Sequence, residues 1–114
     1  WQASNDLPLT IWSTAYNQKR PYLGINDACR SIIFIIKNDI FIGDIYNVLT
    51  ENFSVAEIIK IIRKIKPKIK IKFVKNKIMN HYSYRVSNKK IIKLGFRFRD
   101  DFNKIIKDEL KLLC

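Results

Sequence analysis

The sequence predicts a small mixed α/β fold, one domain over residues 1–114, in which short strands alternate with amphipathic helices. The 114 residues are 47% apolar, which suits a single hydrophobic core. Lys alternates with Ile through residues 68–72, the period of a strand with one wet face. Apolar residues within 54–66 recur instead at helical spacing. The expected order is β, β, α, β, α, β, α, α, without an internal repeat.

The first elements are expected to be two short extended segments and a helix. Residues 8–12 are rich in β-branched and aromatic side chains and predict a strand. Residues 22–25 follow a proline and predict a second extended segment. Asn26 or Asp27 is then expected to cap a helix that ends near Asn38.

The middle of the chain is expected to form a strand followed by a capped helix. Residues 44–49 alternate in polarity and are bounded by Gly43, so they predict a strand. Ser54 and Glu57 have the spacing of a capping box, in which each side chain bonds the other's main-chain N–H. The helix that they open is expected to end near Lys66, before a proline.

The last third is expected to add one strand and two helices. Residues 68–74 predict the strand, and residues 82–86 predict a further short one. Residues 87–94 predict a short helix that ends at Gly95, a residue suited to a left-handed cap. Residues 101–112 predict the final helix from their apolar spacing. So few strands leave edges unpaired, which is typical of a piece of a larger sheet.

The formal net charge of +12 comes mainly from lysine and raises the possibility of nucleic-acid binding. Residues 63–72 hold the densest basic run. We interpret it as one wet strand face, with a polyanion-binding ridge as the alternative. Ile and Asn are enriched with Lys, and these residues share AT-rich codons, so base composition accounts for much of the charge.

No catalytic, metal or dinucleotide motif is present in the sequence. The three glycines form no Gly-rich phosphate loop, and His81 is the only histidine. Cys29 and Cys114 have neither metal-site nor disulfide spacing, which fits a reducing cytoplasm. No run is long enough to span a bilayer, and no signal peptide is recognisable. Since the only methionine is Met79, we expect the chain to be a fragment of a longer protein.

An arginine in a stiff context is the best candidate for a binding residue. Arg20 precedes the Pro-Tyr-Leu-Gly-Ile-Asn-Asp sequence that leads into the first predicted helix. A guanidinium group held on extended backbone suits bidentate contact with a phosphate.

Four motifs in order resemble the C-terminal, substrate-binding portion of extended short-chain dehydrogenases/reductases of the nucleotide-sugar epimerase/dehydratase kind. They cover essentially the whole chain, and their combination is more specific than any one of them. The matching segments are residues 9–12, 20–27, 44–58 and 87–96. The resemblance implies part of a Rossmann-type protein: the substrate-binding part plus the last sheet strand, without the Rossmann core.

The resemblance assigns substrate-binding roles to particular residues. Arg20 would contact the diphosphate of a nucleotide-sugar, and Thr10 and Trp12 would offer main-chain groups to the base. Ser83 and Tyr84 would line the sugar pocket.

The family's second phosphate-binding arginine is missing from this sequence. Lys75 or Lys77 stands in its region and would act as a point charge without bidentate geometry.

The resemblance also implies what lies elsewhere. This chain has neither the Gly-rich cofactor turn nor the catalytic Tyr-x-x-x-Lys pair, so it should be inactive alone, with NAD(P) bound by an N-terminal Rossmann domain. Residues 44–49 would join that domain's sheet. Without it, Ile45, Val48 and Ile59 should be exposed, and the chain should pack on a partner, as a homodimer for example, or be marginally stable.

Two other functions stay open on sequence grounds. One is a small basic nucleic-acid-binding module, which we do not favour because only Phe73 interrupts the lysine run for base stacking. The other is a non-catalytic structural or oligomerisation piece of the same parent protein.

Overall fold

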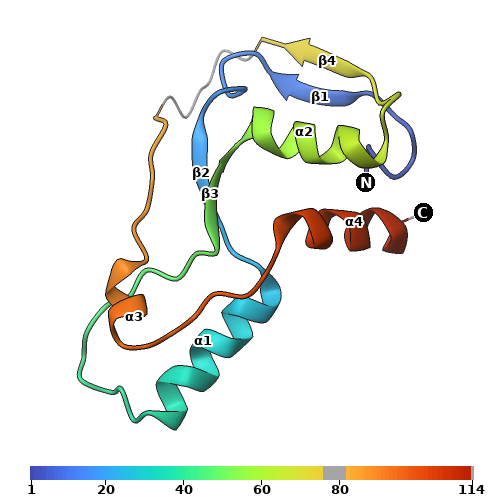
Figure 1. Cartoon of the computed structure of the whole chain (residues 1–114). Helices are drawn as coiled ribbons and strands as arrows, with labels where there is room; N and C mark the ends of the chain where they lie inside the picture. Colours follow the sequence, from blue (N-terminus) through green and yellow to red (C-terminus); the bar gives the residue numbers. More distant parts are fainter. Residues whose placement is uncertain (76–81, 114) are drawn as a thin grey trace.

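The computed structural model describes residues 1–75 and 82–113 of the chain. Its order of helices and strands agrees with the order predicted from the sequence (Figure 1). The elements are β1 (Leu9–Trp12), β2 (Lys19–Tyr22), α1 (Ile25–Lys37), β3 (Glu51–Ser54), α2 (Val55–Ile65), β4 (Ile71–Val74), α3 (Lys89–Lys93) and α4 (Phe102–Leu112).

The strands form two separate two-stranded sheets rather than one. β1 and β4 are parallel, with Leu9 opposite Ile71, and α2 provides part of the crossover between them. β2 and β3 are antiparallel, with Lys19 opposite Ser54. The Lys/Ile alternation before and within β4 places Ile69 in the core and leaves the lysines exposed, as predicted for a strand with one wet face.

Two predicted strands are wrong, and one extended segment is displaced. Residues 44–49 and 82–86 form no strand, and the second extended segment is β2, not residues 22–25. A strand requires a partner for its main-chain groups, and β2 pairs with the residues after 44–49 instead. Hydrophobic alternation alone could not show this, because pairing depends on residues distant in sequence.

Residues 44–49 are held by side-chain contacts to α3 and its preceding residue. The Lys90 ammonium group bonds the Asp44 carboxylate, and Asn88 Nδ2 donates to the Leu49 carbonyl at 2.8 Å. Leu49 is buried, whereas Ile45 is 82% exposed. Residues 44–49 therefore form an irregular loop where a strand was predicted, and this loop still exposes an apolar side chain.

Helix α2 begins at the predicted capping box and supplies much of the core. The Glu57 N–H donates to Ser54 Oγ at 3.2 Å, and Glu57 Oε2 accepts from the Ser54 N–H at 2.7 Å. Ile59 is only 3% exposed, so our expectation that it would be exposed is wrong. The main buried cluster consists of Ala3 in the N-terminal turn, Ile69 before β4 and Leu110 on α4. Half-buried side chains of β1, α2 and α4 pack against it: Leu9, Ile62, Ile65 and Ile106.

Substitution Ser54→Ala should lower the free energy of unfolding by about 0.5–2 kcal/mol, the usual loss for an N-cap hydroxyl. The Glu57 N–H in the first turn of α2 would lose its side-chain acceptor. Thermal or urea unfolding measures the change. Ser87→Ala is the matched control, because Ser87 Oγ accepts only a long 3.4 Å bond near an exposed short helix. A loss as large in the control would contradict a specific role for the capping box.

α1 is capped by a residue from the far end of the sequence, not by Asn26 or Asp27 as predicted. Gly24 occupies the N-cap position, and the Asp27 N–H of the first turn donates to Asp100 Oδ2 at 2.9 Å. A Cβ on Gly24 would lie 2.0 Å from that carboxylate oxygen. Glycine is therefore required where the Asp100 side chain packs on the start of the helix.

The Asp27 carboxylate is fully buried and accepts four hydrogen bonds. Oδ1 accepts from the Arg99 N–H at 2.9 Å and from the Arg30 guanidinium. Oδ2 accepts from the Thr50 hydroxyl at 2.8 Å and from the Asp100 N–H at 3.1 Å. Burial raises the pKa of Asp27, but these bonds outweigh it and hold the pKa below its ordinary value. This junction ties α1 to the segment before β3 and to the segment before α4.

α1 turns its polar side inward and its apolar side outward. Asp27 and Ser31 are buried. The outer stripe comprises Ile25, Cys29, Ile32 and Ile36, spaced four, three and four residues apart, and all four are exposed. A surface helix of a monomeric protein normally turns its apolar residues inward and its polar residues toward solvent.

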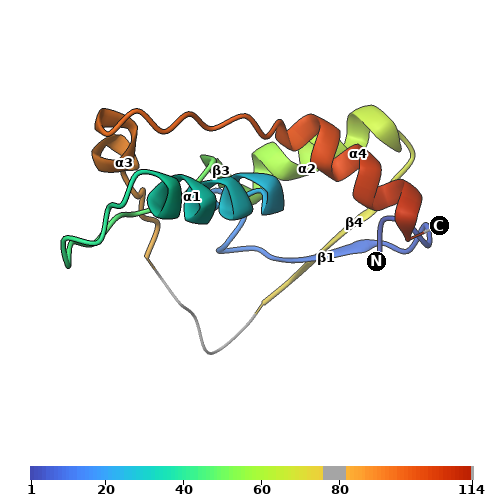
Figure 2. The same cartoon turned by 90° about the horizontal axis from the view of Figure 1, so that it is seen from below.

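The molecule is flat and exposes more surface than a compact monomer (Figure 2). Its extents are 48 × 33 × 17 Å, and its radius of gyration is 16.8 Å. A compact chain of this length would have a radius of gyration of about 13 Å. The accessible surface is 8460 Å², against about 6500 Å² for a compact monomer of this size.

Candidate functional site

Arg20 lies on β2, and its guanidinium group is held by acceptors from two segments. Nη2 donates to Gln18 Oε1 at 2.9 Å, and Nη1 donates to the Lys19 carbonyl at 2.8 Å. Nη1 also donates to the carbonyl of Tyr82. The guanidinium carbon lies 4.9 Å from the centre of the Tyr84 ring, within cation–π range. The orientation of this charge is therefore set without any ligand.

Ser83 and Tyr84 lie beside β2, next to Arg20. The Lys19 N–H donates to Ser83 Oγ at 3.0 Å, although the two residues are 64 positions apart in sequence. The Tyr84 N–H in turn donates to the Lys19 carbonyl at 3.3 Å. Three of the predicted substrate-binding residues thus come together, and we call Arg20, Ser83 and Tyr84 the Arg20 cluster.

Thr10 and Trp12 lie on β1, in the other sheet, so they are not part of the Arg20 cluster. Gln2 bonds Thr10 twice: the Thr10 N–H donates to Gln2 Oε1 at 3.2 Å, and the Thr10 hydroxyl accepts from Gln2 Nε2 at 3.3 Å. Trp12 is half exposed. Lys77 and His81 lie outside the described residues.

Sequence reasoning missed the residues that position Arg20. Gln18 orients the guanidinium group, and Lys19 links β2 to α2 through an ion pair with Glu57 at 3.2 Å. The pKa of Glu57 is lowered to about 2, first by the Ser54 N–H, then by the Ser54 hydroxyl and by Lys19. The sequence contains one indication that Gln18 and Lys19 position Arg20, namely that both are close to it in sequence.

The arrangement can bind an anion or a polar group, and it offers no acid–base pair. In residues 1–75 and 82–113, no three His, Cys, Asp or Glu side chains lie close enough together to hold a metal ion. None of the helices in the described part of the chain has the length and apolar character of a membrane-spanning segment. The guanidinium group of Arg20 is the charged group that the Arg20 cluster presents.

No protein-family model matches the chain, and no curated protein matches it.

Proposed function

We propose that this chain is the substrate-binding C-terminal part of an NAD(P)-dependent nucleotide-sugar epimerase or dehydratase of the cytoplasm. The proposal rests on the Arg20 cluster. The sequence motifs assign Arg20 to the substrate diphosphate and Ser83 and Tyr84 to the sugar pocket, and these residues lie side by side. In this proposal a diphosphate approaches the fixed guanidinium group, and the sugar lies toward Ser83 and Tyr84.

The outer stripe of α1 supports the proposal of a separate cofactor-binding half. A helix with Ile32 and Ile36 exposed and Asp27 buried is suited to lie between two layers. The excess surface of roughly 2000 Å² is of the size that a large inter-domain or obligate interface buries. In this proposal a Rossmann domain carries the cofactor and covers that stripe.

Substitution Arg20→Ala should weaken binding of UDP- or GDP-sugars by about 10- to 100-fold, because a hydrogen bond to a charged group contributes about 1.5–3 kcal/mol. Isothermal titration with UDP-glucose and with GDP-mannose measures the change. The titration is done with the chain alone and with the chain joined to any upstream half. Arg63→Ala is the matched control, since Arg63 is exposed in the last turn of α2.

Equal affinities for wild type and the Arg20→Ala variant would contradict the proposed diphosphate contact. The reading frame upstream of Trp1 gives an independent test. The proposal expects a Gly-rich strand–turn–helix and a Tyr-x-x-x-Lys pair there. A frame without both would contradict the proposed enzyme class.

Nucleic-acid binding is a second candidate, favoured by the row of exposed lysines Lys64, Lys68, Lys70 and Lys72 on and before β4. Contacts with phosphates of a nucleic-acid backbone release counterions, so affinity would fall steeply with salt. Binding of a nucleotide-sugar would instead saturate with one ligand per chain. A steep salt slope together with no response to Arg20→Ala would favour this second candidate.

A further inference from the structure

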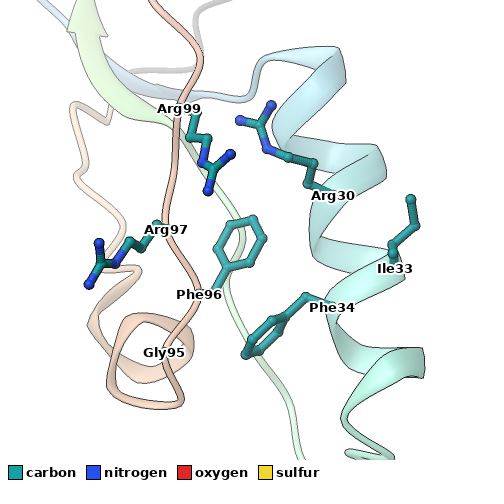
Figure 3. A pocket seen from close by; sticks show the side chains of 7 residues that line it. All are labelled: Arg30, Ile33, Phe34, Gly95, Phe96, Arg97 and Arg99. Atoms are coloured by element: carbon teal, nitrogen blue, oxygen red, sulfur yellow. The ribbon is translucent and has the colours of Figure 1, made fainter.

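A cavity between α1 and the segment after α3 collects three arginines (Figure 3). Its volume is about 290 Å³, and Arg30, Arg97 and Arg99 line it together with Phe34 and Phe96. The two phenylalanine rings meet edge to face, with centres 5.4 Å apart, and Phe96 is buried. The cavity therefore combines an aromatic floor with a strongly positive rim, and it does not include the Arg20 cluster.

The positive charges on this rim are only partly neutralised by the protein. Asp27 is the one carboxylate that contacts a rim arginine, and its four acceptor positions are already filled. In residues 1–75 and 82–113, neither Arg97 nor Arg99 has a carboxylate within ion-pair distance. Of the three rim arginines, only Arg30 is paired with a carboxylate in the described part of the chain.

The geometry of two of these arginines suits a shared acceptor. Figure 3 shows the guanidinium groups of Arg30 and Arg99 turned toward one another, whereas that of Arg97 points away. Arg30 Nε is buried and has no hydrogen-bond partner among the described residues. Two like charges that face each other repel, and a buried donor without an acceptor is unfavourable. An oxyanion between the two guanidinium groups would relieve their repulsion.

We infer that this cavity is a second anion site, which holds a phosphate group between Arg30 and Arg99. A phosphate is negatively charged at neutral pH and has several acceptor oxygens, which suits the forked donors of these two arginines. The phosphate is either inorganic phosphate or the phosphate of a small organic ester whose planar part rests on Phe34 and Phe96. The inference goes beyond the proposed function, because it concerns a different surface.

Isothermal titration of the whole chain with inorganic phosphate and, separately, phenyl phosphate tests the inference at low, constant ionic strength. Each probe should bind saturably, with one molecule per chain in this cavity. Tighter binding of phenyl phosphate would identify an organic ester as the natural ligand, and equal affinity would identify the free ion. Absence of saturable binding by either probe would overturn the site.

Arg99→Ala should weaken both probes about tenfold or more, because it removes one forked donor. It is chosen over Arg30→Ala, since removing Arg30 would leave buried Asp27 without its cation. Arg99→Lys should restore part of the affinity as a point charge. Arg63→Ala should leave the affinity for both probes within about twofold, because distant surface charges are screened. Equal losses in Arg99→Ala and Arg63→Ala would show diffuse charge attraction and overturn the site.

Discussion

Substitution Asp27→Ala should destabilise the folded chain by about 3–5 kcal/mol, because several donors would lose a buried acceptor and each unsatisfied buried donor costs about 1–3 kcal/mol. The variant would leave the Thr50 hydroxyl and the Arg99 and Asp100 N–H groups without their acceptor. It would also leave Arg30 beside an apolar side chain. Small domains have a total stability of about 5–15 kcal/mol, so the loss is a large fraction of the stability of the chain. Urea unfolding followed by circular dichroism measures this.

Asp108→Ala is the matched control, because Asp108 is exposed on α4, and its effect should stay within about 0.5 kcal/mol.

The dependence of stability on pH provides a second check. Because the pKa of Asp27 is lower in the folded chain, its stabilising contribution is complete above the ordinary value of 3.8 and is lost as pH falls through the folded-state pKa. The stability difference between wild type and Asp27→Asn should shrink over that acid range. A stability difference that stays constant over this pH range would contradict a lowered pKa for Asp27.

The double substitution Ile32→Glu/Ile36→Glu should abolish association through α1 while leaving the chain folded. Both side chains belong to the outer stripe, and Ile32 is 61% exposed. Burying an isoleucine at an interface contributes about 1.5–3 kcal/mol, so the two changes should weaken association by at least about 100-fold. Analytical ultracentrifugation of the 114-residue chain, or a pull-down by the cofactor-binding half, measures the change.

Leu112→Glu is the control for this second prediction, because Leu112 is an exposed apolar residue on α4, outside the outer stripe. It should leave association unchanged. A wild-type chain that sediments as a stable monomer would argue against a partner on α1. Unfolding of the double variant would show instead that the stripe stabilises the chain itself.

Local sequence signals predicted the start of α2 well and the start of α1 poorly. The bonds between Ser54 and Glu57 are local, so their spacing was sufficient to place the helix start. The first turn of α1 is capped instead by Asp100, through a contact across 73 residues that no local pattern reports. The same reason explains why β3 was placed too early in the sequence.

The candidate site shows the same division between local and distant information. Sequence motifs singled out Arg20, Ser83 and Tyr84, but they could not show that Tyr84 stacks on the guanidinium group. The cavity with Arg30 and Arg99 was not predicted at all. Those two arginines are far apart in sequence, and only the fold brings them to one rim.

The capping of α1 by Asp100 has a consequence for the order of folding during synthesis. A ribosome releases the chain from its N-terminus, so α1 leaves long before the carboxylate that closes its first turn. Closing so long a loop has an entropic cost that slows folding. Until Asp100 has been synthesised, the first turn of α1 is uncapped and its apolar residues are exposed. We therefore expect the nascent helix to be a substrate for a chaperone.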